Sequence, residues 1–121
     1  VEYDPRLMEQ DMGEWENVPF FGLLDSGDER LRAMLRDWTE TPPPGGESYA
    51  ELRARVEAAL HDITERGEDT LIVAHNGPLA TALALLLGLG DAQVKGFWFE
   101  QGCWSCVEEL RGEMRLKYFN K

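Results

Sequence analysis

The apolar run at residues 70–74 (TLIVA) and the four residues after it, His75-Asn76-Gly77-Pro78, constrain the fold more than any other part of the sequence. The run is short, continuous and rich in β-branched residues, which is typical of a parallel strand covered on both faces. The proline suits the first position of a helix. The leucines at 79–87 continue it as a buried helix that should stop at Gly88 or Gly90.

The residues before this run predict helices. Ser48 and Glu51 form an S-x-x-E capping box, in which the serine oxygen and the glutamate satisfy unpaired backbone N–H groups. Apolar residues at helical spacing then indicate a helix that ends near Gly67. An earlier helix is expected at 28–38, and the proline- and glycine-rich residues 42–46 should form the loop between the two.

The C-terminal part of the sequence favours short strands at 94–99, 103–110 and 114–119. A turn at Arg111-Gly112 makes the last two a hairpin with one solvated face. We therefore expect residues 1–121 to form a single α/β domain with a mainly parallel sheet flanked by helices and a C-terminal antiparallel hairpin. The sheet is expected to be incomplete, because the parallel neighbours of strand 70–74 would lie upstream of Val1.

Composition narrows the function classes. A chain of 121 residues with 43% hydrophobic content can bury a core. The net charge of −11 argues against a nucleic-acid partner, because such affinity comes largely from lysine and arginine. The longest apolar stretch, 79–89, is too short to span a bilayer. We expect a soluble, cytoplasmic protein with neither nucleic acid nor membrane as partner.

Cys103 and Cys106 have the C-x-x-C spacing of some redox and zinc sites. The structural interpretation is favoured, because the pair falls in a predicted strand and residues three apart in a strand point to opposite faces. Zinc would also need two further ligands, which the neighbouring residues do not offer. The sequence calls for no metal and no organic cofactor.

His75 is the strongest candidate for a functional residue. In open α/β sheets, ligands bind beyond the carboxyl ends of the strands, where helices begin. His75 follows the predicted strand directly, and the amides of Asn76 and Gly77 would be unpaired donors at the helix N-terminus. This arrangement predicts an anion site. The only other histidine, His61, is expected on the surface of a helix.

The acidic segment near the N-terminus is a second candidate. One of its carboxyl groups could donate a proton if an apolar wall partly desolvated it. Composition does not choose among Glu9, Asp11, Glu14 and Glu16.

Three segments in this order, residues 4–16, 44–48 and 71–77, resemble the histidine phosphatase superfamily, in the branch of phosphoglycerate mutase-like proteins and α-ribazole phosphatases. The resemblance implies that Glu9 protonates the leaving oxygen and later activates water, and that His75 binds the phosphoryl oxygens. It implies a phosphate-facing backbone at Asn76 and Gly77. It also implies that a loop at the pocket rim, Gly46, Glu47 and Ser48, orients a small phosphorylated metabolite.

One departure from the family is larger than any of these matches. Family members begin with a strand ending in an Arg-His-Gly motif, whose histidine is phosphorylated, and this motif is missing from the sequence. The expected function is therefore that of a phosphomonoester hydrolase in the intact protein, acting through a phosphohistidine, with this chain alone inactive and a piece of a longer enzyme.

Some alternatives stay open at this point. The chain could instead be a non-catalytic pseudoenzyme or interaction module that binds small anions. Phosphatase and mutase are not distinguished. A homodimer could form through an exposed strand edge or through the aromatic residues 97–99.

Overall fold

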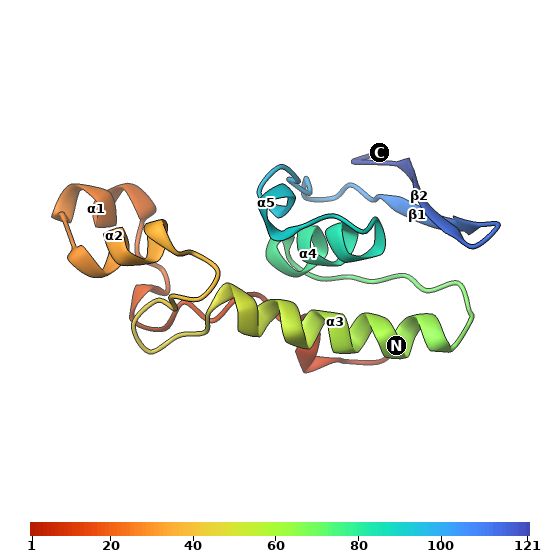
Figure 1. The fold of residues 1–121 in the computed structure, drawn as a ribbon, viewed down its shortest axis with the longest axis horizontal. Helices are drawn as coiled ribbons and strands as arrows, with labels where there is room; N and C mark the ends of the chain where they lie inside the picture. The colour runs from red at the N-terminus through yellow and green to blue at the C-terminus, as the bar shows by residue number, and fades with distance from the viewer. The chain divides into compact units, whose positions relative to one another are not determined.

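The computed structural model describes all residues from 1 to 121, which group into two compact units (Figure 1). The larger unit comprises Val1–Glu9 and Val56–Lys121, and the smaller unit comprises Gln10–Arg55. The long helix α3 (Tyr49–Glu65) contributes residues to both. No helix is long and apolar enough to cross a membrane.

The smaller unit is helical. It contains the 3₁₀ turn η2 (Gly13–Trp15), α1 (Phe20–Ser26) and α2 (Glu29–Arg36). Helix α2 confirms the helix expected at 28–38, and Asp28 caps it by accepting a hydrogen bond from the Arg30 amide over 2.8 Å. Helix α1 was not predicted, because its sequence FFGLLDS has no polar face to reveal a helical period.

The capping box at the start of α3 is confirmed. The Ser48 amide donates to Glu51 Oε2 over 2.8 Å, and the Glu51 amide donates to Ser48 Oγ over 3.1 Å. Ser48 is buried, and the apolar residues around this helix start form the core of the smaller unit. That core consists of Trp15, Leu31, Tyr49 and Leu52.

The larger unit contains the 3₁₀ turn η1 (Pro5–Leu7), the rest of α3, α4 (Asn76–Leu86), α5 (Asp91–Val94), β1 (Cys106–Leu110) and β2 (Glu113–Tyr118). Helix α4 confirms the buried helix, and its core residues are mostly alanine, leucine and threonine. It begins two residues earlier than predicted, so that Pro78 is its third residue. It ends before Gly88, which has a positive φ of 70°.

The strand predicted at 70–74 is not formed in this structure. No strand is assigned there, and Leu71 and Val73 are 78% and 87% exposed. The only sheet is two-stranded, made of β1 and β2. A parallel strand is held by hydrogen bonds to a neighbouring strand. A segment whose sequence suits a strand therefore does not form one where no neighbour pairs with it.

The C-terminal hairpin is confirmed, with antiparallel pairing of β1 and β2. Arg111 and Gly112 both have positive φ, as a tight two-residue hairpin turn requires. The strand predicted at 94–99 is wrong: Val94 ends helix α5, and the Gln93 side chain accepts from the Gly90 amide at its start. The predicted dry face of β2 is also wrong, because Met114 and Leu116 are 36% and 37% exposed.

Candidate active site

The structure brings Glu9 to the N-terminus of α4. The Gly77 amide, at the second position of that helix, donates to Glu9 Oε2 over 3.3 Å. Amides in the first turn of a helix have no partner within the helix, and the helix dipole favours negative charge there. Residues 68 positions apart in the sequence therefore meet at the anion-binding end of α4.

His75 is the residue directly before α4. Its backbone is extended (φ −108°, ψ 167°), and its side chain does not cap the helix. It is exposed and lies in the lining of a cavity of about 930 Å³ in the larger unit. The rest of the lining comes from residues 70–74, from Ile63 and Arg66, and from the N-terminal residues 1–5, 7 and 8.

Gly77 must be small in this arrangement. A Cβ atom at this position would lie 2.3 Å from Glu9 Oε1, which is far closer than two such atoms can approach. The absence of a side chain lets the carboxylate rest against the backbone of the helix start.

Of the four candidate carboxyl groups, the Glu9 carboxylate accepts a hydrogen bond from an α4 amide, that of Gly77. The other three bond within the smaller unit. Asp11 accepts from the Gly13 amide over 2.8 Å, and Glu16 accepts from the Met12 amide over 2.8 Å. Glu14 pairs with Arg30 over 3.2 Å. The hydrogen bonds thus distinguish Glu9 from its acidic neighbours, which composition could not do.

The rim residues predicted from the resemblance belong to the smaller unit. The Glu47 carboxylate accepts from Arg55 Nε over 3.0 Å and from the Asp11 amide over 3.2 Å. The hydrogen bonds from Arg55 are the main reason that the pKa of Glu47 is lowered. Gly46 leaves room for Asp11, because a Cβ atom there would lie 2.3 Å from the Asp11 carbonyl oxygen. Ser48 is the helix cap described above.

Two side-chain contacts near the site were missed by sequence reasoning. Arg6 donates to Asp4 over 2.8 Å and to Asp62 on α3 over 2.7 Å. The bond to Asp62 ties η1 to α3 at a point three residues before Glu9. The Asn76 side chain accepts from the Phe99 amide over 2.8 Å. The partners are 56 and 23 residues apart, and no sequence pattern signals such pairs.

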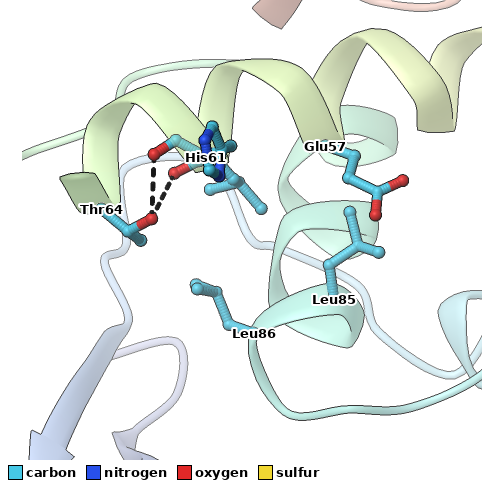
Figure 2. A pocket seen from close by; sticks show the side chains of 6 residues that line it. Glu57, His61, Thr64, Leu85 and Leu86 are labelled. Atoms are coloured by element: carbon cyan, nitrogen blue, oxygen red, sulfur yellow. Dashed lines mark hydrogen bonds between the residues drawn. The ribbon is translucent and has the colours of Figure 1, made fainter.

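His61 is not among the residues that line the His75 cavity. It is exposed on α3 and lines a small pocket of about 210 Å³ with Glu57, Thr64, Leu85 and Leu86 (Figure 2). The Thr64 hydroxyl donates to the backbone carbonyls of Leu60 and His61 over 2.9 and 3.1 Å. The prediction of a surface histidine is confirmed. No group of three or more histidine, cysteine, aspartate or glutamate side chains is placed to hold a metal ion, and both cysteines are free thiols.

Comparison with known proteins identifies the class of protein to which the chain belongs. The family model of the histidine phosphatase superfamily (branch 1) matches residues 1–121. The chain belongs to this superfamily, as its sequence resemblance indicated.

Within that superfamily, the chain is similar to two curated phosphatases. The chain is 33% identical to an adenosylcobalamin/alpha-ribazole phosphatase of Salmonella typhimurium, over 96% of the chain and 58% of that protein. It is 30% identical to the Escherichia coli protein of the same name, over 99% of the chain and 60% of that protein. The chain thus spans less than two thirds of the length of these relatives.

Solved structures show the same fold. An alpha-ribazole phosphatase from Shigella flexneri superposes with a TM-score of 0.89 and 29% identity, covering 100% of the chain and 61% of that structure. A mycobacterial glucosyl-3-phosphoglycerate phosphatase, 24% identical, shares the fold with a TM-score of 0.74, over 98% of the chain and 63% of that structure. The chain therefore has the phosphoglycerate mutase-like α/β fold, although its parallel sheet is not formed by these residues alone.

Proposed function

We propose that the whole protein to which these residues belong is a phosphomonoester hydrolase that acts through a phosphohistidine. Glu9 is the proton donor and later the base, and His75 binds the phosphoryl oxygens together with the Asn76 amide and with the Gly77 amide, which the Glu9 carboxyl and a phosphoryl oxygen share. One observation carries the proposal: the Glu9 carboxylate lies 3.3 Å from the Gly77 amide, at the helix start that follows His75. A proton donor and an anion-binding helix end are thus adjacent.

The chemistry takes two steps. In the first, a nucleophilic histidine outside these residues attacks phosphorus. The bond from phosphorus to the leaving oxygen then breaks, and the Glu9 carboxyl gives its proton to that oxygen. In the second, a water molecule attacks the phosphohistidine while the Glu9 carboxylate takes its proton, which releases phosphate and the free histidine. His75 and the helix-end amides stabilise the charge on the phosphoryl oxygens in both steps.

Further positive charge would come from outside these residues. Phosphoryl transfer depends on cations around the transferring group. Six arginines of the chain already form ion pairs with carboxylates: Arg6, Arg30, Arg32, Arg55, Arg66 and Arg115. This supports a site that is completed by the part of the relatives that the chain does not span.

The proposed substrate is a small phosphorylated metabolite. The net charge of −11 disfavours a polyanionic partner. The names of the relatives point to alpha-ribazole phosphate as the first natural substrate to assay. No observation on this chain favours the alternative of a non-catalytic anion-binding module.

Hydrolysis of a generic aryl phosphate by the whole protein tests the proposal. We expect Glu9→Gln to lower kcat/KM by about 100-fold or more, because a positioned acid supplies at least that factor. We expect His75→Ala to lower it by about 100- to 1000-fold, as removal of a charge-stabilising donor does. Acid-labile phosphate on the protein, trapped during turnover, reports the phosphohistidine.

Glu14→Gln is the matched control, because Glu14 is a carboxylate five residues further along the chain whose ion-pair partner is Arg30. It should stay within about twofold of the parent. The proposal fails if Glu9→Gln or His75→Ala remains within a few-fold of the parent. Binding of inorganic phosphate without any turnover would instead support the non-catalytic module.

A further inference from the structure

We infer that the Asn76 side chain is a positioning residue for His75, acting through the segment Phe97–Glu100; the inference rests on the proposed function. Asn76 is the first residue of α4 and shares a peptide bond with His75. Its backbone amide is one of the proposed phosphate-binding donors. Its side chain instead binds the backbone of a segment more than 20 residues away.

The contact is specific and partly buried. Asn76 Oδ1 accepts from the Phe99 amide over 2.8 Å. The Phe99 amide belongs to no helix or strand, so this carboxamide satisfies a donor that would otherwise need water or a sheet partner. The bond therefore fixes the first residue of α4 to the C-terminal part of the larger unit.

A second asparagine holds the other side of the same segment. Asn120 Nδ2 donates to the Trp98 carbonyl over 2.8 Å, and Asn120 Oδ1 accepts from the Glu100 amide over 3.1 Å. The Phe99 and Phe119 rings pack edge to face with their centroids 5.0 Å apart. Two carboxamides and one ring pair thus hold the backbone of residues 98–100 between the start of α4 and the end of the chain.

The helix side of the contact carries a side-chain hydrogen bond of its own. Thr81 is fully buried, and its hydroxyl donates to the Gly77 carbonyl over 2.8 Å. Asn76 is thus tied to Phe99, outside the helix, and Gly77 is tied to Thr81 within it, so each of the two residues after His75 takes part in a side-chain hydrogen bond. Displacement of a group that contacts a reacting phosphoryl by about 1 Å can cost 100-fold in rate. The Asn76 carboxamide therefore sets where the imidazole lies.

Two variants of the whole protein test this role through separate changes in kcat and KM. Asn76→Ala removes the acceptor of the Phe99 amide, and we expect kcat for aryl phosphate to fall about 10- to 100-fold with KM within about twofold. Asn76→Asp keeps an oxygen in the same place but adds a negative charge beside the anion site. Its kcat should stay within about threefold of the parent, and its KM should rise about 10-fold because the carboxylate repels the substrate.

Gln93→Ala is the matched control. It removes another carboxamide acceptor from a backbone amide of the larger unit, that of Gly90, over 3.0 Å. Its kcat and KM should equal those of the parent. The inference is overturned if Gln93→Ala lowers kcat as much as Asn76→Ala does, since any loosening of the unit would then suffice. It is also overturned if Asn76→Ala raises KM alone, since the side chain would then contact the substrate.

The imidazole signals of His75 in the NMR spectrum, assigned by their loss in His75→Gln, give a readout that needs no turnover. Asn76→Ala should shift or broaden them, and Gln93→Ala should not. If the whole protein hydrolyses nothing, the proposed function fails, while these signals still decide whether Asn76 positions His75. Unchanged signals in Asn76→Ala would overturn the inference even in an active enzyme.

Discussion

Gly77 shows how one missing side chain shapes the site. Its amide holds the Glu9 carboxylate, and the space that a Cβ atom would need is taken by Glu9 Oε1. The group that must give way is the end of a flexible, exposed side chain, whereas the backbone of α4 can stay where it is. A substitution at this position should therefore act on activity and spare the fold.

We predict that Gly77→Ala in the whole protein lowers kcat/KM for aryl phosphate by about 100-fold, because the Glu9 carboxylate must move by an ångström or more. The free energy of unfolding should be equal or higher by up to about 1 kcal/mol, because alanine is favoured over glycine within a helix. Steady-state kinetics and chemical denaturation of the same samples measure the two effects.

Gly22→Ala is the control for that substitution. Gly22 also lies within a helix, α1, and a Cβ atom there would meet nothing within 4 Å. It should show the same small gain in stability with unchanged activity. A Gly77→Ala enzyme of normal activity would show that the Glu9 position seen here is not the one used in catalysis.

At this scale the sequence predicted where the candidate residues lie along the fold, but not their contacts. The glycine and histidine of the H-x-G pattern were predicted at the anion-binding end of a helix, and α4 starts there. The choice of Glu9 came from the family pattern. The structure adds that its acidic neighbours accept from backbone amides close to them in the sequence or pair with Arg30. The contacts of Asn76 with Phe99 and of Arg6 with Asp62 join distant residues, so no local pattern predicts them.

Between elements, Glu47 joins three parts of the smaller unit. Its carboxylate accepts from the Asp11 amide and pairs with Arg55 on α3. Its backbone carbonyl accepts from the Gln10 side chain over 2.9 Å. The side chains of Glu47 and Arg55 are each only 20% exposed. Such a charge-assisted pair is stronger than an exposed one.

We predict that Glu47→Gln lowers the free energy of unfolding by about 1–2 kcal/mol at neutral pH, as the loss of a hydrogen-bonded charged partner does. The pKa of Glu47 is lowered in the folded protein by Arg55. The contribution of the Glu47 carboxylate to the free energy of unfolding is therefore complete above the ordinary carboxyl pKa, and it is lost as the pH falls through the lowered pKa of the folded protein. The difference from the parent should shrink accordingly below about pH 4.5.

Glu108→Gln serves as the comparison, because Glu108 pairs with Arg115 across the exposed hairpin. Its effect at neutral pH should be smaller, since solvent screens that pair. Denaturation at a series of pH values measures both variants. A stability loss in Glu47→Gln that is independent of pH would contradict the ionic explanation.

Helices were predicted better than strands in this chain, for a physical reason. A helix satisfies its hydrogen bonds within one segment, so the capping box of Ser48 and Glu51 and the apolar spacing locate α3 without reference to the rest of the molecule. A strand depends on its neighbour. In the hairpin, β1 and β2 are neighbours in sequence, joined by a two-residue turn, and they pair with each other. Residues 70–74 have no such partner strand next to them in the sequence.

At the scale of the whole molecule, the chain corresponds to only part of its relatives. The chain spans 58% and 60% of the two curated phosphatases, and its most apolar extended segment lies exposed along a cavity. An exposed apolar strand-like segment is a site for pairing with further backbone. We expect residues 70–74 to become an interior strand in the whole protein, in agreement with their sequence pattern.

Leu71→Ala distinguishes the two environments of that segment. With the 78% exposure seen here, the substitution should change the free energy of unfolding by less than about 0.5 kcal/mol. In an interior strand the same change should cost about 2–5 kcal/mol, because it removes buried methyl groups and leaves a cavity. We predict the larger cost for the whole protein. Leu35→Ala, on the exposed side of α2 with 45% exposure, is the control and should cost less.

Amide hydrogen exchange at residues 71–74 checks the same point independently, because strand pairing slows exchange to the rate of the protein's core. A small cost together with fast exchange at these amides would mean that the segment stays a surface loop, and that the parallel sheet expected from the sequence does not include it.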